Sequence, residues 1–349
     1  MERRGLLDEK GLTALLEVLT REYRVVAPVP LEGGAYGLAP LSEADPSMVD
    51  LAGVRPYQPM KSFFLKPRQR VAYDYQTRVP QADERPFCLL GAKACDLEGM
   101  AVQDAVFLEG DFRDPFYGAA RERNLVITSD CGFAADTCFC TAMGGAPYAE
   151  KGFDLNITVL PGSWLLEAGS SAGESLMDRL EEHVRPADEE SLERRRHQRD
   201  RVSAEVRKAV DESGVPDTGR LDGVIMKAYE SPVWKDEADR CVECGACNTV
   251  CPTCHCFLLY DQMLQAGEEM EKLRVWDSCL LKGFARVAGG ENPRPELWMR
   301  LRNRFEKKFD FFPKTEDIYA CTGCGRCIAA CPAEIDIREV LRRLVEDAR

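Results

Sequence analysis

Apolar positions in the first half of the chain follow two alternating periods. Segments with helical spacing are separated by short apolar runs that end at glycine, proline or polar residues. Residues 30–86 are rich in proline, glycine and mixed charge and show neither period clearly. The elements predicted are, in order, a helix over 8–20, strands over 23–29 and 87–91, helices over 97–108 and 116–123, and strands over 125–129 and 157–160. This alternation predicts an α/β unit.

The second half of the chain has mostly helical spacing. Residues 173–212 form a long charged tract that predicts solvated helices bridging two domains. A basic docking face is the alternative for this tract, but acidic residues are interspersed among its arginines. Residues 213–219 contain the glycine, proline and polar residues of a linker. Three further helices are predicted over 257–273, 295–309 and 337–345.

Two cysteine motifs dominate the last third of the chain. Each has the spacing C-x2-C-x2-C-x3-C followed by proline, and the copies begin at Cys241 and Cys321. Two copies are the bacterial ferredoxin signature for two [4Fe–4S] clusters, in which the fourth cysteine of each copy ligates the other cluster. The predicted ligand sets are Cys241, Cys244, Cys247 and Cys331 for one cluster, and Cys321, Cys324, Cys327 and Cys251 for the other. A pair of structural zinc sites is the alternative, but it explains neither the cysteine triplets nor the prolines.

These motifs complete the predicted fold. The class is α+β, with an N-terminal α/β domain followed by a mostly helical dicluster ferredoxin domain. The predicted boundaries are an α/β domain over 1–170, a charged helical bridge and linker over 171–220, and the ferredoxin-like domain over 221–349.

Four more cysteines are placed where a third cluster would need them. Cys95 and Cys131 each follow a predicted strand, and ligands bind outside the carboxyl ends of strands in an open α/β sheet. Cys138 and Cys140 lie in the next glycine-rich loop. We therefore predict a third cluster in the N-terminal domain, held by Cys95, Cys131, Cys138 and Cys140. The alternative is that Cys95 and Cys131 are small buried apolar side chains, as free cysteines often are.

The remaining four cysteines stay unassigned. Cys254 and Cys256 follow the first ferredoxin motif directly, Cys279 lies farther along, and Cys88 lies in the middle of a predicted strand. Three roles stay open for Cys254, Cys256 and Cys279. They could hold an additional cluster, Cys254 and Cys256 could share a site with Cys138 and Cys140, or they could simply pack in the core. The run from Cys251 to His255 also matches the C-x-x-C-H haem pattern, but haem attachment would consume a predicted cluster ligand, so we expect no haem.

Composition excludes several functional classes for this protein. The 349 residues carry sixteen cysteines and a net charge of −13, which argues against broad nucleic-acid binding. We expect no signal peptide and no membrane insertion, so reduced thiols in the cytoplasm are favoured over disulfides. No dinucleotide fingerprint follows a predicted strand, so we expect the chain to bind neither FAD nor NAD, and three histidines leave no plausible hydrolase triad.

Several motifs together resemble a known family. They are Gly91–Leu97, Thr137–Gly144, Cys251–Phe257, Trp276–Cys279, Ala288–Arg294 and Cys321–Asp336, and the likeness spans about residues 60 to 345. In combination they are similar to the iron–sulfur beta subunit of cytoplasmic sulfhydrogenases, a family itself similar to an iron–sulfur subunit of anaerobic sulfite reductases. His255 stands where an aromatic residue is expected in such relatives.

The resemblance implies an electron-transfer subunit of a multi-subunit oxidoreductase without catalytic activity of its own. Its expected partners are a flavin- and NAD(P)H-binding subunit, together with a catalytic subunit of the hydrogenase, sulfite reductase or heterodisulfide-reductase-like kind. Two alternatives stay open: a catalytic reductase with an open, substrate-binding cluster near Cys254, Cys256 and Cys279, and a structural or redox-sensing scaffold.

Overall fold

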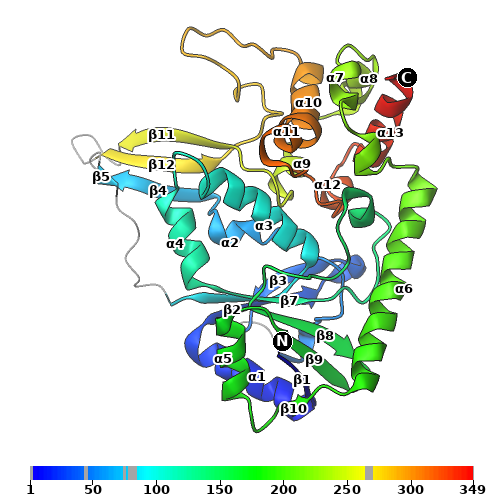
Figure 1. Ribbon diagram of the computed structural model, residues 1–349. Helices are drawn as coiled ribbons and strands as arrows, with labels where there is room; N and C mark the ends of the chain where they lie inside the picture. The colour runs from blue at the N-terminus through cyan, green and yellow to red at the C-terminus, as the bar shows by residue number, and fades with distance from the viewer. Residues whose placement is uncertain (1–2, 43–45, 74–75, 78–84, 264–269, 349) are drawn as a thin grey trace.

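The computed structural model describes residues 3–42, 46–73, 76–77, 85–263 and 270–348. A large mixed sheet, of strand order β10-β1-β9-β8-β7-β6-β2-β3, forms the lower half of the molecule (Figure 1). Strands β2, β6, β7 and β8 are parallel, and antiparallel strands extend the sheet on both sides. The strands are β1 (Arg4–Leu7), β2 (Arg24–Pro30), β3 (Tyr36–Pro40), β6 (Phe87–Ala92), β7 (Leu125–Ser129), β8 (Leu155–Leu160), β9 (Ser163–Ala168) and β10 (Arg185–Pro186).

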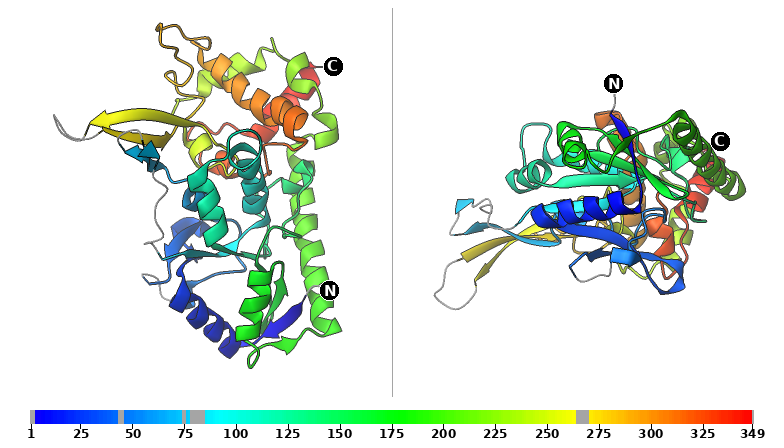
Figure 2. Two further views of the ribbon diagram at one scale, coloured as in Figure 1. Left: turned by 60° about the vertical axis from the view of Figure 1, so that its left-hand side comes forward. Right: turned by 90° about the horizontal axis from the view of Figure 1, so that it is seen from below.

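Helices cover both faces of this sheet. On one face lie α1 (Glu9–Glu22) and α5 (Ser171–Arg179), and on the other lie α2 (Lys61–Phe64), α3 (Ala94–Phe107) and α4 (Pro115–Arg123) (Figures 1 and 2). Successive strand residues point to opposite faces, so in β6 Leu90 packs toward α1 and α5 while Leu89 packs toward α3. Both faces are buried, which explains why every residue of β6 and β7 is buried, including the polar Thr128 and Ser129.

The predicted elements of this half are confirmed, with boundaries shifted by at most three residues. Local capping explains where two helices begin. Asp8 accepts a hydrogen bond from the N–H of Gly11 at 2.9 Å, and Asp114 accepts bonds from the N–H groups of Phe116 and Tyr117 at 3.0 and 2.8 Å. The α+β class is also confirmed.

A long helix, α6 (Glu189–Ser213), runs beside the sheet toward the C-terminal helices (Figure 1). The solvated helices predicted within 173–212 correspond to α5 and α6, and His183 and His197 in this tract are exposed. Some arginines of α6 nevertheless face inward. Arg195 pairs with Glu167 and Arg199 with Asp130, each at 2.8 Å, so these charges hold the helix against the sheet.

The C-terminal region is a cluster of short helices around its own apolar core, which includes Trp234, Phe305 and Leu341. The helices predicted over 295–309 and 337–345 are confirmed. The elements are α7 (Val224–Lys227), α8 (Val233–Arg240), α9 (Ala246–Thr249), α10 (Leu297–Glu306), a π-helical turn (Lys307–Phe311), α11 (Phe312–Glu316), α12 (Arg326–Ala329) and α13 (Ile337–Asp347).

The prediction of a helix over 257–273 is wrong. The described part of this segment forms the hairpin strands β11 (Phe257–Met263) and β12 (Met270–Trp276), and residues 264–269 lie outside the described residues. Strand β12 also pairs with β4 (Arg68–Tyr73), which in turn pairs with β5 (Gln76–Thr77). Leucine, glutamate and methionine favour a helix locally, but pairing with a distant strand overrides that preference. The hairpin projects from the body of the molecule in both views of Figure 2.

Candidate iron–sulfur centres

The two ferredoxin-type loops have the same backbone conformation. Each contains two residues of positive φ, Glu243 and Gly245 in the first loop and Gly323 and Gly325 in the second, followed by a single helical turn. Such alternation turns successive backbone N–H groups into a concave nest, which is a common binding site for anions, including iron–sulfur clusters. Both loops therefore have a backbone that suits the clusters predicted from their cysteine spacing.

The glycines of the second loop also permit a close approach. A Cβ atom at Gly323 would lie 2.5 Å from the carbonyl carbon of Phe139, and one at Gly325 would lie 2.1 Å from the carbonyl oxygen of Thr137. The N–H of Phe139 donates to the carbonyl of Gly323 at 2.8 Å. The second loop is thus pressed against the loop that carries Cys138 and Cys140.

The first predicted ligand set meets at one cavity. Its lining includes Cys241, Cys244, Cys247 and Cys331, and Cys327 of the second set reaches the same wall. The crossover of Cys331 from the second motif to the first is therefore present in the fold, as the ferredoxin pattern requires.

The second predicted set is buried more deeply. Burial raises the pKa of Cys327, Arg304 lowers it, and the neighbouring thiols of Cys251, Cys324 and Cys321 raise it further. Burial also raises the pKa of Cys321 to about 12, against the influence of Lys308 and of the N–H of Gly323. These four thiols are close enough to repel one another as thiolates, which is the situation that bound iron relieves.

The third predicted set also meets at one cavity. Cys95 at the start of α3, Cys131 just after β7, and the Cys138 and Cys140 pair all line it, and so does Cys324. Both strand-following cysteines lie at the carboxyl edge of the parallel strands, where the topology predicted them.

Buried cations without carboxylate partners surround these cysteines. In the part of the chain that the structure describes, Lys93, Arg55, Arg304 and Lys308 are all buried and none has a carboxylate within 4.0 Å. Lys93 donates to Ser129 Oγ and to the carbonyl of Leu51, at 2.8 and 3.0 Å. Lys308, in the π-helical turn, donates to Cys251 Sγ at 3.4 Å, to Thr253 Oγ1 at 2.7 Å and to the carbonyl of Ala320 at 2.8 Å.

A buried charge is costly unless an opposite charge accompanies it. A [4Fe–4S] cluster with thiolate ligands is anionic, so it supplies the countercharge that these lysines and arginines lack. The residues present therefore fit iron–sulfur clusters. Within the described ranges no three His, Cys, Asp or Glu side chains converge as a single metal ion would require, whereas a cluster needs thiolates spaced around a cage.

The second set lies between the other two. Cys327 reaches the cavity of the first set, and Cys324 reaches the cavity of the third. Between these two cysteines, Arg326 of α12 extends to Asp96 of α3 and forms a fully buried ion pair at 2.8 Å. The three cysteine groups thus form one continuous row through the molecule.

Comparison with known proteins identifies the region of the two ferredoxin-type motifs and the family of the chain. The family described as "4Fe-4S dicluster domain" matches residues 240–335. The chain is 31% identical to sulfhydrogenase 2 subunit beta of Pyrococcus furiosus over 324 residues, which cover 93% of this chain and 92% of that protein. The chain belongs to the sulfhydrogenase beta subunit family. It is an iron–sulfur electron-transfer subunit with a [4Fe–4S] dicluster domain.

Part of the chain is also similar to pyruvate-flavodoxin oxidoreductase of Trichormus variabilis. It has 29% identity over 107 residues, which are 31% of this chain and 7% of that protein. No helix among the described residues of this family member is long and apolar enough to cross a membrane.

The cysteines left unassigned have different surroundings. Cys88 is fully buried in the sheet core and packs with aliphatic side chains. Cys254, Cys256 and Cys279 instead gather at the base of the β11–β12 hairpin beside the ferredoxin-type loops. The sequence left a role for these three cysteines open, and the hairpin, which was predicted to be a helix, is the element that brings them together.

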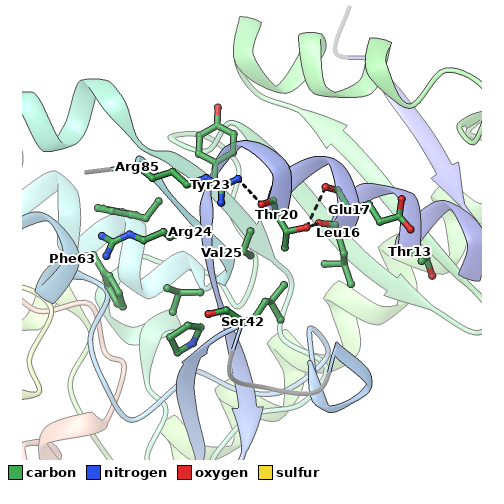
Figure 3. A pocket seen from close by; sticks show the side chains of 14 residues that line it. Thr13, Leu16, Glu17, Thr20, Tyr23, Arg24, Val25, Ser42, Phe63 and Arg85 are labelled. Atoms are coloured by element: carbon green, nitrogen blue, oxygen red, sulfur yellow. Dashed lines mark hydrogen bonds between the residues drawn. The ribbon is translucent and has the colours of Figure 1, made fainter. Parts of the chain in front are cut away.

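A separate cavity of about 770 Å³ lies beside α1, β2 and β3 (Figure 3). None of the described residues that line it is a cysteine. Arg85 closes part of its rim by donating to the carbonyl of Thr20 at 2.6 Å. This cavity is therefore independent of the row of cysteine groups.

One partly buried carboxyl near the third group predicts a pH effect on stability. Burial raises the pKa of Glu98 to about 7 from its ordinary value of 4.5. The folded chain holds this proton where the unfolded chain has lost it, so the contribution of Glu98 to stability falls as pH rises from 4.5 through 7. Glu98→Gln should raise the thermal midpoint at pH 8, by an amount equivalent to about 3 kcal/mol, and the two proteins should converge toward pH 4.5.

The matched control for this prediction is Glu174→Gln, at an exposed position of α5. It should leave the pH profile of the thermal midpoint unchanged. An unaltered pH profile in Glu98→Gln would contradict the assigned role of this carboxyl.

Proposed function

We propose that this chain relays electrons within a multi-subunit oxidoreductase, between a flavin- and NAD(P)H-linked partner and a catalytic partner. The catalytic partner would be of the hydrogenase, sulfite reductase or heterodisulfide-reductase-like kind. The observation that carries the proposal is the continuous row of three cysteine groups, whose middle member borders both others. A relay needs such a row, whereas a single-site enzyme does not.

The proposed ligand sets follow the row. They are Cys241, Cys244, Cys247 and Cys331 at one end, Cys251, Cys321, Cys324 and Cys327 in the middle, and Cys95, Cys131, Cys138 and Cys140 at the other end. Bound [4Fe–4S] clusters supply one-electron transfer. The chain itself holds them, excludes water and offsets their charge with Lys308, Arg304, Arg55 and Lys93.

Both ends of the row have exposed neighbours, which supports a relay with two partners. Next to the first group, Val242 is 64% exposed and Cys244 is also exposed. Next to the third group, Phe133 lines the cavity and is 42% exposed. Apolar side chains at these two points are suited to contact with partner subunits.

The proposal keeps the division into 1–170, 171–220 and 221–349, with the pairing of β4 and β12 joining the outer two parts. A cytoplasmic location is proposed with it, because iron–sulfur clusters require reduced thiolates.

The test is reduction of this chain by a nicotinamide through its partner. The native assembly would be purified anaerobically, its other chains identified, and its electron paramagnetic resonance spectrum recorded after addition of NADH or NADPH. We expect cluster signals of this chain to appear in the assembly and to be absent when the isolated chain receives the same nucleotide. Reduction of the isolated chain, or no reduction in an intact assembly, would contradict the proposed division of labour.

A further inference from the structure

Three of the cysteines outside the proposed ligand sets gather at one point. Cys256 comes just before β11 and Cys279 soon after β12, and the hairpin brings them together, with the N–H of Asp277 donating to the carbonyl of Cys256 at 3.0 Å. Their two side chains are hydrogen-bonded to each other. Cys254 precedes the hairpin and completes the group.

The side chain of Asn248 connects these thiols. Its Nδ2 donates to Cys279 Sγ at 3.3 Å, and its Oδ1 accepts from Cys254 Sγ at 3.6 Å. Asn248 is itself buried in α9, within the first ferredoxin-type motif. The group of Cys254, Cys256 and Cys279 is therefore held in place by the first motif.

Positive charge without a carboxylate partner meets at this group as well. Lys61 of α2 is 4% exposed and donates to the carbonyls of Cys254 and Asn248, at 2.7 and 3.3 Å. Its Nζ also lies 4.4 Å from the ring centre of Trp276. Arg304 donates to Asn248 Oδ1 at 2.8 Å. In the described part of the chain neither cation has a carboxylate within ion-pair distance.

The same argument that fits clusters to the other groups applies here. Buried Lys61 needs a countercharge, and neutral carbonyl oxygens supply only partial charge, whereas Arg304 is shared with the ferredoxin-type pair. Three thiolates around an iron–sulfur core would supply that countercharge.

We infer that Cys254, Cys256 and Cys279 are the protein ligands of a further iron–sulfur cluster, beside the ferredoxin-type pair. With three cysteines, one iron of a [4Fe–4S] cluster would have no cysteine ligand. The group borders both sets of the pair, since Cys254 is hydrogen-bonded to Cys251 and Cys279 acts electrostatically on Cys247. The site thus branches from the proposed row and does not extend either end of it.

The test counts iron and acid-labile sulfide in the isolated full-length chain, purified anaerobically, so that iron of the partner subunits is not counted. With the three proposed clusters and this one, we expect about sixteen irons per polypeptide. Cys279→Ala should lower the count by about four and leave the spectra of the other clusters in place. The matched control is Cys88→Ala, which removes a buried thiol from the sheet core and should retain all the iron.

The outcomes separate this inference from the proposed function. About twelve irons in the unaltered chain, falling to about eight in Cys131→Ala and unchanged in Cys279→Ala, would overturn the inference and leave the three-cluster proposal standing. About eight irons that survive both substitutions would overturn both. About one zinc ion lost from Cys279→Ala, with no loss of iron, would overturn the inference in favour of a zinc site.

A measurement on the unaltered chain covers the case in which Cys279→Ala does not fold. The chain is denatured anaerobically, alkylated, and its cysteine-containing peptides are weighed. Ligands of a cluster are released as free thiols, so Cys256 and Cys279 should both be alkylated. A disulfide between them in the native chain would leave both unlabelled and would overturn the inference.

Discussion

Replacing Cys324 by alanine should remove the middle cluster of the row and interrupt electron flow between the two partners. Cys324 is buried, and it borders the cavity of the third cysteine group. Alanine offers no ligand, so iron should fall by about four per polypeptide. Partner-to-partner turnover should fall by more than the ~10- to 100-fold that follows loss of an outer-shell partner at a metal site.

The readouts are iron content and the two half-reactions, each measured with an artificial electron carrier. Both half-reactions should persist, because they belong to the partners. Cys88→Ala, which truncates a buried thiol of the sheet core, should alter neither iron nor turnover. If both half-reactions were lost from a still-assembled complex, the chain would be more than a relay; if turnover survived the loss of the iron, the row would not be the route.

Replacing Asp96 by alanine should destabilise the fold more than any surface substitution. The carboxylate pairs with Arg326 at 2.8 Å, and neither side chain is more than 1% exposed. Its removal leaves a buried guanidinium without its partner, which typically costs about 3–5 kcal/mol. The pair joins α3 to α12, so the contact between the N-terminal sheet and the second ferredoxin-type loop should weaken first.

The measurement is the anaerobic thermal midpoint, for which we expect a decrease on the order of 10 °C. Asp178→Ala is the matched control, since it breaks the exposed pair of Asp178 with Arg3, and exposed pairs contribute ~0–1 kcal/mol. The double variant Asp96→Ala with Arg326→Met should recover part of the loss, because it removes the unpaired charge. Equal midpoints for Asp96→Ala and Asp178→Ala would show that the buried pair does not join the two parts.

The segment 257–273 shows where prediction from local sequence pattern fails in this chain. Leu258, Leu259 and Met263 are exposed on β11, whereas Leu273 on β12 is buried, so the apolar residues of this segment do not form one buried helix face. On β12, Arg274 is buried and donates to Gln69 Oε1 at 2.6 Å, and it is also paired with Asp114. Those partners are more than 150 residues away, and no window of the sequence contains them.

The candidate ligands were easier to predict than the groups that surround them. Cysteine spacing identified the two ferredoxin-type motifs, and strand position identified Cys95 and Cys131, because both signals lie within a few residues. Lys61, Lys93, Arg304 and Lys308 carried no such signal. Whether a lysine is solvated or buried without a carboxylate depends on which segments pack around it, and in the sequence these four look like any other charged residues.

Sequence alone determined the family, the alternation of strands and helices in the first half, and the inventory of thiols, since motif spacing and apolar periodicity are local properties of the chain. Tertiary structure alone decided that three cysteine groups form a row, that a hairpin gathers three more cysteines beside it, and that buried cations face each group. The physical reason is distance along the chain. Lys61 reaches Cys254 and Arg326 reaches Asp96 only after folding, and the countercharge that makes these sites suitable for anionic clusters is the sum of such long-range contacts.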